Sequence, residues 1–198
     1  YLLSASAFAP YDYKLTFGKF KKMYKWGYFP ETKEYANFNK LINEKKEHSI
    51  IWVGRLIELK HPEIAILLAD KLNKAGYNFK LTLIGEGPLH NSIIKMIEEM
   101  KLYNQVNLLG ALPSDEVRNY MEKNTFFIFT SDKNEGWGAV LNEAMNSACV
   151  VFSSDSIGSA HYLINNSING FIYPNGDVES LYKLLCSIFD NKEKCIEV

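Results

Sequence analysis

The stretch Glu135-Gly136-Trp137-Gly138-Ala139-Val140-Leu141-Asn142-Glu143 joins an apolar run at residues 126–130 to a helical pattern that ends near Ser147. An uninterrupted apolar run of this length predicts a buried strand, and the spacing after it predicts a helix. The two glycines of the turn let a ligand approach the backbone closely, because no Cβ stands in the way. The free N–H groups at a helix start favour an anion. The stretch therefore predicts a strand–turn–helix unit with a ligand at its turn.

The two carboxylates of this stretch are too far apart to act as one acid–base pair. If Glu135 and Glu143 were both helical, they would stand about 12 Å apart along the axis at 1.5 Å per residue. They cannot share a proton at that separation. We expect them to hold two parts of one long ligand.

Strand and helix patterns alternate along the rest of the chain from residue 49. The strands are almost wholly apolar, which is typical of a parallel sheet covered on both faces. We therefore predict a Rossmann-like, doubly wound α/β fold. Strands are expected at residues 49–53, 79–84, 106–109, 126–130, 150–152 and 171–173. Helices are expected at 61–75, 88–101, 161–164 and 178–189, together with one that begins after the cap Ser114 and one that ends near Ser147.

Polar or glycine-bearing loops follow five of the expected strands, at residues 54–55, 85–87, 110–112, 131–138 and 153–158. Parallel strands end at the same edge of a sheet, so these loops predict one ligand cleft. Arg55 and Lys60 beside a helix start suit a diphosphate, although each alone is equally consistent with a solvated turn. Glu143 lies at the edge of an apolar stripe, where a carboxylate needs a partner. Ribose hydroxyls would serve.

The composition indicates one globular domain with an attached piece. The chain has 198 residues, 47% of them hydrophobic, and we divide it into residues 1–48 and 49–198. Residues 1–12 read as a strand and its exit turn, and residues 34–48 as a polar, exposed helix. Between them, lysines alternate with aromatic residues. Such a segment binds nucleic acid or an anionic membrane in some proteins, but we favour a linker whose aromatics pack on a neighbouring domain.

Several classes of function are disfavoured. The net charge of −1 gives no signal for nucleic acid binding. Cys149, Cys186 and Cys195 lack metal-ligand spacing and suit a reducing compartment, and the four histidines do not cluster, so we expect no metal site. No stretch is long and apolar enough to span a membrane. We expect a cytoplasmic protein, with peripheral membrane contact left open.

An ordered set of motifs resembles the carboxyl-terminal half of the family-four (group 1) retaining glycosyltransferases, which have the two-domain GT-B fold. The separation of Glu135 from Glu143 matches the signature of that family, and the resemblance covers roughly residues 49–190. The motifs are Val53-Gly54-Arg55-Leu56 with Lys60, Gly85-Glu86-Gly87-Pro88, Val106 with Gly110, and Glu135-Gly136-Trp137-Gly138 with Glu143-Ala144-Met145.

The resemblance implies a role for each motif. Arg55 and Lys60 would hold the diphosphate of a UDP- or GDP-type sugar and stabilise its charge as it leaves, Glu135 would hold hydroxyls of the donor sugar, and Glu143 would hold the ribose. The loop at residues 110–112 would contact the base. The family works with retention and needs neither a metal nor another cofactor. The implied substrate-binding residues are Gly54, Gly85, Gly87, Leu112, Gly136, Trp137, Gly138, Ala139, Val140 and Glu143.

The resemblance also implies what this chain lacks. A sugar or lipid-linked acceptor would bind an amino-terminal domain, of which residues 1–48 read as the end and the linker. The chain alone is therefore expected to be inactive as a hexosyltransferase-type enzyme of polysaccharide or glycolipid biosynthesis. One motif departs from the family. Where many members have Gly-Gly-x-x-Glu, this chain has Gly158-Ser159-Ala160-His161-Tyr162, so Tyr162 replaces the glutamate.

Two other functions remain open at this point. A non-catalytic nucleotide-binding module would have the same sheet, because fold does not fix function. The discriminating residue is Glu135, since a simple nucleotide binder has no need of a carboxylate facing the sugar. Another GT-B enzyme, such as a sugar-nucleotide epimerase, would share the cleft.

Overall fold

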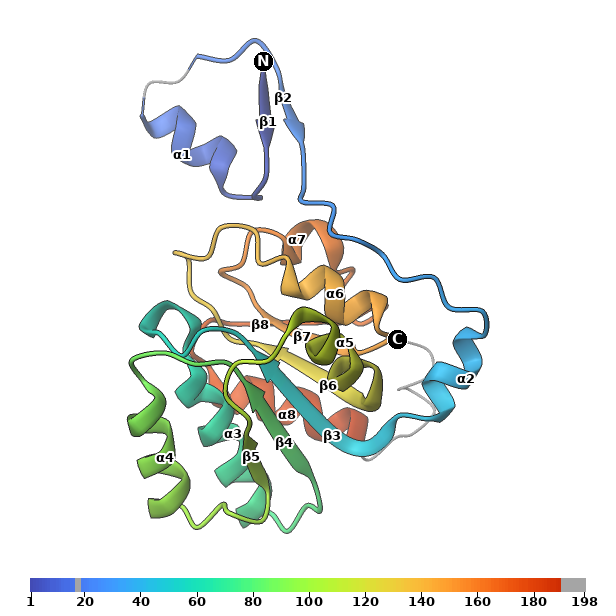
Figure 1. Ribbon diagram of the computed structural model, residues 1–198. Coiled ribbons are helices and arrows are strands. Elements are labelled where there is room, and N and C mark those ends of the chain that lie inside the picture. The colour runs from blue at the N-terminus through green and yellow to red at the C-terminus, as the bar shows by residue number, and fades with distance from the viewer. Residues whose placement is uncertain (17–18, 190–198) are drawn as a thin grey trace.

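The computed structural model describes residues 1–16 and 19–189 and contains a six-stranded parallel sheet with the order β5-β4-β3-β6-β7-β8 (Figure 1). This confirms the predicted doubly wound α/β fold. The strands are β3 (Lys46–Val53), β4 (Lys80–Ile84), β5 (Val106–Leu108), β6 (Asn124–Phe129), β7 (Val150–Ser154) and β8 (Phe171–Tyr173).

The strand order places a switch point between β3 and β6. The chain runs outward from β3 through β4 to β5, then returns to the other side of β3 as β6 and continues to β8. The connections after β3 and β6 therefore leave in opposite directions, which opens a crevice at the carboxyl ends of these two strands. The loops that carry Arg55, Lys60 and Glu135 all follow these strands.

Helices cover both faces of the sheet. One apolar cluster joins the sheet to α3 (Pro62–Lys74), α4 (His90–Glu99) and α8 (Val178–Phe189). A second cluster joins the opposite face to α5 (Ser114–Lys123), α6 (Val140–Asn146) and α7 (Ala160–Leu163). Burial on both sides explains why the strands read as continuous apolar runs rather than alternating ones.

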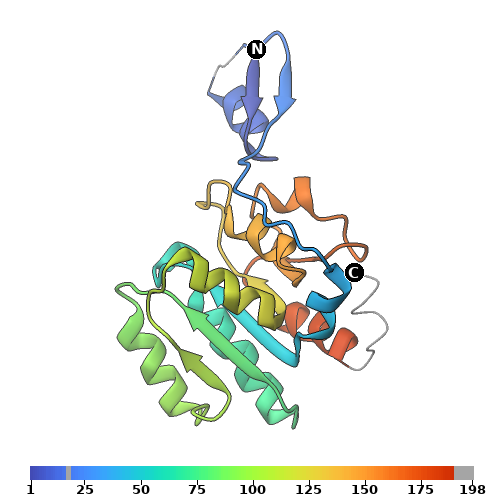
Figure 2. The same ribbon diagram turned by 45° about the vertical axis from the view of Figure 1, so that its right-hand side comes forward.

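Residues 1–16 and 19–25 form a separate small lobe. Strands β1 (Leu2–Ser4) and β2 (Met23–Lys25) pair in parallel, and α1 (Ala9–Leu15) lies between them in sequence. The lobe projects from the sheet domain in two views (Figures 1 and 2). An extended linker then runs to α2 (Phe38–Asn43), which leads into β3.

Some element boundaries differ from those expected. Residues 9–12 begin α1 instead of forming an exit turn, because Pro10 occupies the first turn of a helix, where its missing N–H costs nothing. The strand β3 begins at Lys46 rather than Ser49, so residues 46–48 belong to the central sheet. Ser114 is the first residue of α5 and not its cap, and Pro88 lies before α4.

Candidate active site

A cavity of about 560 Å³ opens at the switch point of the sheet. Its walls come from the loops after β3 and β6 and from the first turns of α5 and α6. It brings together the three residues expected to be catalytic and six of those expected to bind substrate. The lining residues are Val53, Gly54, Arg55, Leu59, Lys60, Ser114, Val117, Asn134, Glu135, Gly136, Gly138, Ala139, Val140 and Glu143.

Lys60 and Glu135 form an ion pair inside this cavity. The Lys60 ammonium donates to Oε2 of Glu135, and the two side chains are only 16% and 11% exposed. The aromatic ring of Phe129 lies beside the ammonium, with its centroid 5.5 Å from Nζ. Burial makes this pair stronger than a surface salt bridge, but also costly to leave half-made. The pair therefore fixes the loop after β3 against the loop after β6.

A buried polar relay holds Lys60 in position. The indole N–H of Trp52 donates to Thr130 Oγ1 at 2.9 Å, and the Thr130 hydroxyl donates to the carbonyl of Lys60 at 2.6 Å. The backbone N–H of Asp132 donates to the carbonyl of Leu59 at 2.9 Å. The end of β6 thus holds the short helical turn Glu58–Lys60 through both side-chain and backbone groups.

Glu143 lies in α6 and lines the same cavity as this pair. Its carboxylate is half-buried, and among residues 1–16 and 19–189 no group forms a hydrogen bond or ion pair with it. Burial raises its pKa above the ordinary value for glutamate, while the charge of Arg118 opposes that rise.

Arg55 is exposed at the mouth of the cavity, directly after β3. The backbone on either side of it is well held, since Gly54 N–H bonds the Ile84 carbonyl and Leu56 N–H bonds the Glu86 carbonyl. An exposed cation on a well-held backbone suits the binding of an anionic ligand.

Trp137 is expected to contact the sugar and phosphates through its backbone, and its side chain packs outside the cavity wall. Its side chain is 4% exposed and does not line the cavity. The indole N–H donates to Asn142 Oδ1 at 2.8 Å, and the ring lies against Gly27, Tyr28 and Tyr162. Trp137 therefore fastens the turn to α6 and to the linker, while its backbone stays next to the cavity.

Gly85, Gly87 and Leu112 also lie outside the cavity wall. Gly85 has φ +145°, and a Cβ there would stand 1.8 Å from the carbonyl oxygen of Gly54. A Cβ at Gly87 would stand 2.4 Å from the carbonyl oxygen of Leu56. Leu112 packs against the core cluster that contains α5 and α6. The two glycines let the β4 loop support the β3 loop, so their visible contribution is packing.

The structure also adds residues that the sequence reading missed. Val53, Leu59 and Asn134 adjoin predicted site residues in the chain, so their proximity was a usable signal. Ser114 and Val117 come from the first turn of α5 and enter the cavity wall through the packing of α5 beside α6. In the sequence Ser114 reads as a helix cap, and a cap carries no signal of a place in the site.

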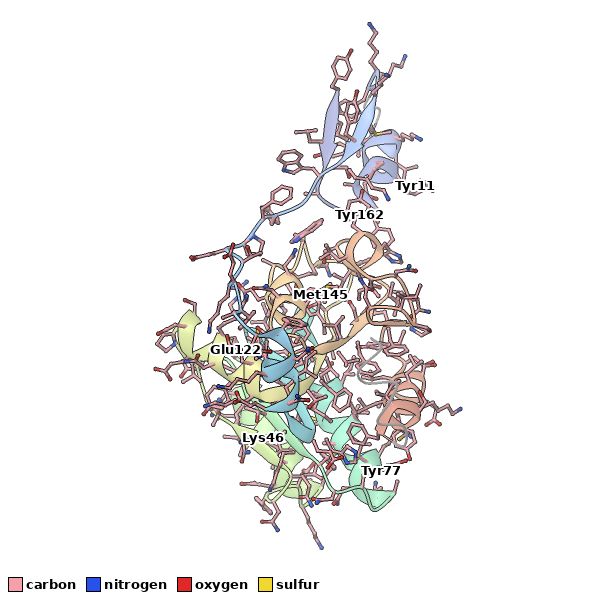
Figure 3. The ribbon with its side chains drawn as sticks, turned by 90° about the vertical axis from the view of Figure 1, so that its right-hand side faces the viewer. Tyr11, Lys46, Tyr77, Glu122, Met145 and Tyr162 are labelled. Carbon is pink, nitrogen blue, oxygen red and sulfur yellow. The ribbon has the colours of Figure 1, made fainter. Side chains whose placement is uncertain are left out.

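Tyr162, the residue that replaces the family glutamate, contacts the amino-terminal lobe. Its hydroxyl donates to the carbonyl of Ser6 at 3.0 Å, and the Lys25 ammonium lies 5.1 Å from the centre of its ring. Figure 3 shows Tyr162 where the sheet domain meets the lobe. The tyrosine therefore docks the lobe instead of presenting a carboxylate to the cavity.

Within residues 1–16 and 19–189, no cluster of three or more His, Cys, Asp or Glu side chains is arranged to hold a metal ion. Over the same described residues, no helix has the length and apolarity needed to cross a bilayer. Cys149 is buried in the core as a free thiol and Cys186 is free in α8, whereas Cys195 lies outside the described residues.

Comparison with known proteins identifies relatives of this chain. The family model described as "Glycosyl transferases group 1" matches residues 34–197. The chain is 29% identical over 154 residues to the amylovoran biosynthesis glycosyltransferase AmsK of Erwinia amylovora, covering 75% of this chain and 38% of that protein. It is 29% identical over 146 residues to an N-acetylgalactosaminyltransferase of Campylobacter jejuni that is named for a diphospho-undecaprenol substrate, covering 74% and 38%. The chain thus spans about two fifths of the length of these relatives.

Solved structures share the fold. TarM superposes with a TM-score of 0.82 at 21% identity, over 99% of this chain and 37% of that one. Anabaena HepE, solved with UDP and glucose, superposes with a TM-score of 0.79 at 17% identity, over 98% and 55%. These similarities confirm the Rossmann-like architecture found in GT-B glycosyltransferases. With the family model covering most of its residues, the chain belongs to the group 1 glycosyl transferases.

Proposed function

We propose that this chain binds a nucleotide-diphosphate sugar in the switch-point cavity and supplies the donor half of a retaining glycosyl transfer. The observation that carries the proposal is the Lys60–Glu135 pair, with exposed Arg55 and the half-buried carboxylate of Glu143 in the wall of the same cavity. The cavity volume of about 560 Å³ lies within the usual range for small-molecule sites. Membership of the glycosyl transferases favours transfer over the non-catalytic module and the epimerase.

Each group has a distinct task in this proposal. The diphosphate binds Arg55 and Lys60, whose fixed charges stabilise the leaving group as the glycosidic bond breaks. Glu135 accepts hydrogen bonds from donor-sugar hydroxyls, and Lys60 keeps its carboxylate in place. The turn at residues 136–139 offers backbone N–H groups to the sugar and phosphates. Glu143 accepts hydrogen bonds from the ribose hydroxyls, which relieves an otherwise unpartnered carboxylate.

Two cations in the cavity wall take the place of a divalent ion, so we propose that the reaction needs no metal. Retention is part of the same proposal. Because Glu135 is held by Lys60 within the sugar region, it serves to orient the sugar, and the acceptor attacks from the face that the diphosphate leaves. The stereochemistry is readable from the anomeric NMR signal of the first product formed by an active, full-length relative or assembly.

The activity of the whole protein is a wider proposal. The relatives named above are about twice as long as this chain, and their names cite amylovoran biosynthesis and a diphospho-undecaprenol substrate. We propose a sugar or lipid-linked acceptor, held by a second domain, and a cytoplasmic site of action at or near a membrane. Because acceptor and donor must be positioned together with water excluded, residues 1–198 alone should transfer no sugar.

Calorimetric titration with UDP and with GDP tests the proposal. One of them should bind the folded chain at micromolar to low millimolar concentration, and Glu143→Ala should weaken that binding. Glu98→Ala provides a matched control, because Glu98 is exposed on α4 and outside the cavity. If neither nucleotide binds a folded sample at millimolar concentration, the proposed function is wrong.

A further inference from the structure

A second cavity of about 410 Å³ adjoins the donor cavity, and Glu143 and Ser114 belong to the walls of both. The other walls of the second cavity are the linker, through Glu31 and Lys33, and α5, through Asp115, Arg118 and Asn119. Glu143 therefore faces the proposed donor on one side and Arg118 on the other.

Arg118 is oriented by α6 itself. Its Nη2 donates to the side-chain oxygen of Asn146, one turn beyond Glu143 on the same helix. Among the described residues its Nε is buried and has no hydrogen-bond partner. The guanidinium is thus held beside the Glu143 carboxylate without forming an ion pair with it.

Asn146 is in turn fixed by the linker. Its Oδ1 accepts from the backbone N–H of Lys33 at 2.8 Å, and its Nδ2 donates to the Lys33 carbonyl at 3.2 Å. Glu122 of α5 secures the same segment, since it accepts from Lys33 Nζ at 2.6 Å and from the Tyr35 hydroxyl at 2.8 Å. Figure 3 labels Glu122 beside the linker.

The other charges around Glu143 leave Arg118 as its effective counterion. Across the donor cavity, Lys60 is paired with Glu135, and Arg55 is exposed at the mouth. Across the second cavity, Lys33 is paired with Glu122, and Glu31 and Asp115 carry the same sign as Glu143. Consistent with this arrangement, Arg118 is the group whose charge opposes the burial that raises the pKa of Glu143.

We infer that Arg118 is a positioning residue for donor binding: fixed by Asn146, it keeps the Glu143 carboxylate charged and turned toward the ribose hydroxyls of the nucleotide. The inference rests on the proposed function, because it requires a ribose in the cavity. A carboxylate accepts from both hydroxyls of the diol, whereas a protonated carboxyl has lost part of that capacity. The pH dependence of nucleotide binding is therefore the property that Arg118 controls.

The test compares wild type with Arg118→Met, Arg118→Lys and, as a control that alters the same cavity without removing a cation, Asn119→Ala. Affinity for UDP, or for GDP if that is the nucleotide that binds, is measured from about pH 5.5 to 8. Arg118→Met should lose about tenfold in affinity at pH 6 and about twofold at pH 8, because Glu143 then protonates at higher pH. Arg118→Lys should restore most of the profile, and Asn119→Ala should match wild type.

Two further measurements separate positioning from a purely structural role. Arg118→Met should reduce the preference for the nucleotide over its 2′,3′-dideoxy analogue. Carbon-13 NMR of the nucleotide-free proteins, with the Glu143 signal assigned from Glu143→Gln, should show a higher pKa for Glu143 in Arg118→Met than in wild type. Nucleotide binding by a folded Arg118→Met with the wild-type pH profile and diol preference would overturn the inference and leave the proposed function standing. Absence of binding to the wild type would overturn the proposed function, and this inference with it.

Discussion

Lys60 and Glu135 stand 75 positions apart in the chain, yet they pair inside the crevice between β3 and β6. Each lies just beyond the carboxyl end of its strand, so the parallel pairing of two neighbouring strands brings them together. The pair also contributes to stability, because it joins the two loops of the site without any ligand.

Removing one member of the pair should destabilise the chain. Lys60→Met leaves the Glu135 carboxylate largely buried without its cation, and we expect a loss of about 1–3 kcal/mol in the free energy of unfolding. The double variant Lys60→Met/Glu135→Gln should recover part of that loss, since no charge is then stranded. Urea unfolding of the three proteins measures both effects. Additive losses in the double variant would show that the two side chains do not interact.

Arg55 should matter for binding and hardly at all for stability. Because it is exposed, Arg55→Ala should change the free energy of unfolding by less than about 0.5 kcal/mol. It should weaken the binding of a nucleoside diphosphate about tenfold while leaving the weak binding of the nucleoside nearly unchanged. Competition titrations with both ligands compare the two losses. Equal losses for nucleoside and diphosphate would contradict the assignment of Arg55 to the phosphates.

Glu143 should lower the free energy of unfolding of the nucleotide-free chain at neutral pH. Burial raises the pKa of its carboxyl in the folded state, so the folded protein disfavours the charged form that prevails at neutral pH. Glu143→Gln should therefore stabilise the nucleotide-free chain, by up to about 1 kcal/mol once its partial exposure to solvent is taken into account. The gain should be present above the raised pKa and vanish below about pH 4, where Glu143 is protonated in both states.

Urea denaturation at two pH values checks this result. A gain of the same size at about pH 7.5 and at about pH 3.5 would show that the charge of Glu143 is not its cause. Glu98→Gln on α4 serves as the control, because its exposed carboxylate should give no gain at either pH.

The linker should tolerate no side chain at Gly27. A Cβ at this position would stand 2.8 Å from two carbon atoms of the Trp137 ring, which is buried and held by its bond to Asn142. Gly27→Val should therefore cost about 1–3 kcal/mol in unfolding free energy. It should also lower nucleotide affinity, because Trp137 anchors the turn between Glu135 and α6. Tyr28→Ala, which removes bulk instead of adding it, provides the comparison. If a folded Gly27→Val variant binds the nucleotide with wild-type affinity, the packing of Trp137 does not influence the site.

The sheet and the ion-paired part of the site were predictable because their signals are local. The strands around Ile50, Leu83, Phe127 and Val151 are buried on both sides and so read as unbroken apolar runs. Arg55, Lys60 and Glu135 follow two of these strands at once, and parallel topology alone brings them to one edge. The position of Glu143 on the margin of an apolar helix face predicts a carboxylate that needs a partner, and within the described residues no group forms a hydrogen bond or ion pair with it.

Other features depend on contacts that one sequence does not reveal. The glycine-bearing turn predicts backbone contacts to substrate at residues 136–139, but it does not predict that the ring of Trp137 packs against Gly27 and Tyr162. Ser114, Val117 and Arg118 reach the site through the packing of α5 on α6. Nothing in the sequence distinguishes Arg118 from a surface cation, and only the structure shows its hydrogen bond to Asn146. Tyr162 was recognised as a departure from the family, but its contact with Ser6 required the structure.

The linker holds α6 at both of its ends. Near the start of the helix Gly27 and Tyr28 cover Trp137, which bonds Asn142, and at its end Lys33 bonds Asn146. A mutagenesis study aimed at the proposed donor preference of this protein would begin with the cavity wall. Mutant libraries confined to that wall would omit residues 27–33, although these residues set where α6, and with it Glu143, stands. The linker therefore belongs in any such library as fully as the glutamates do.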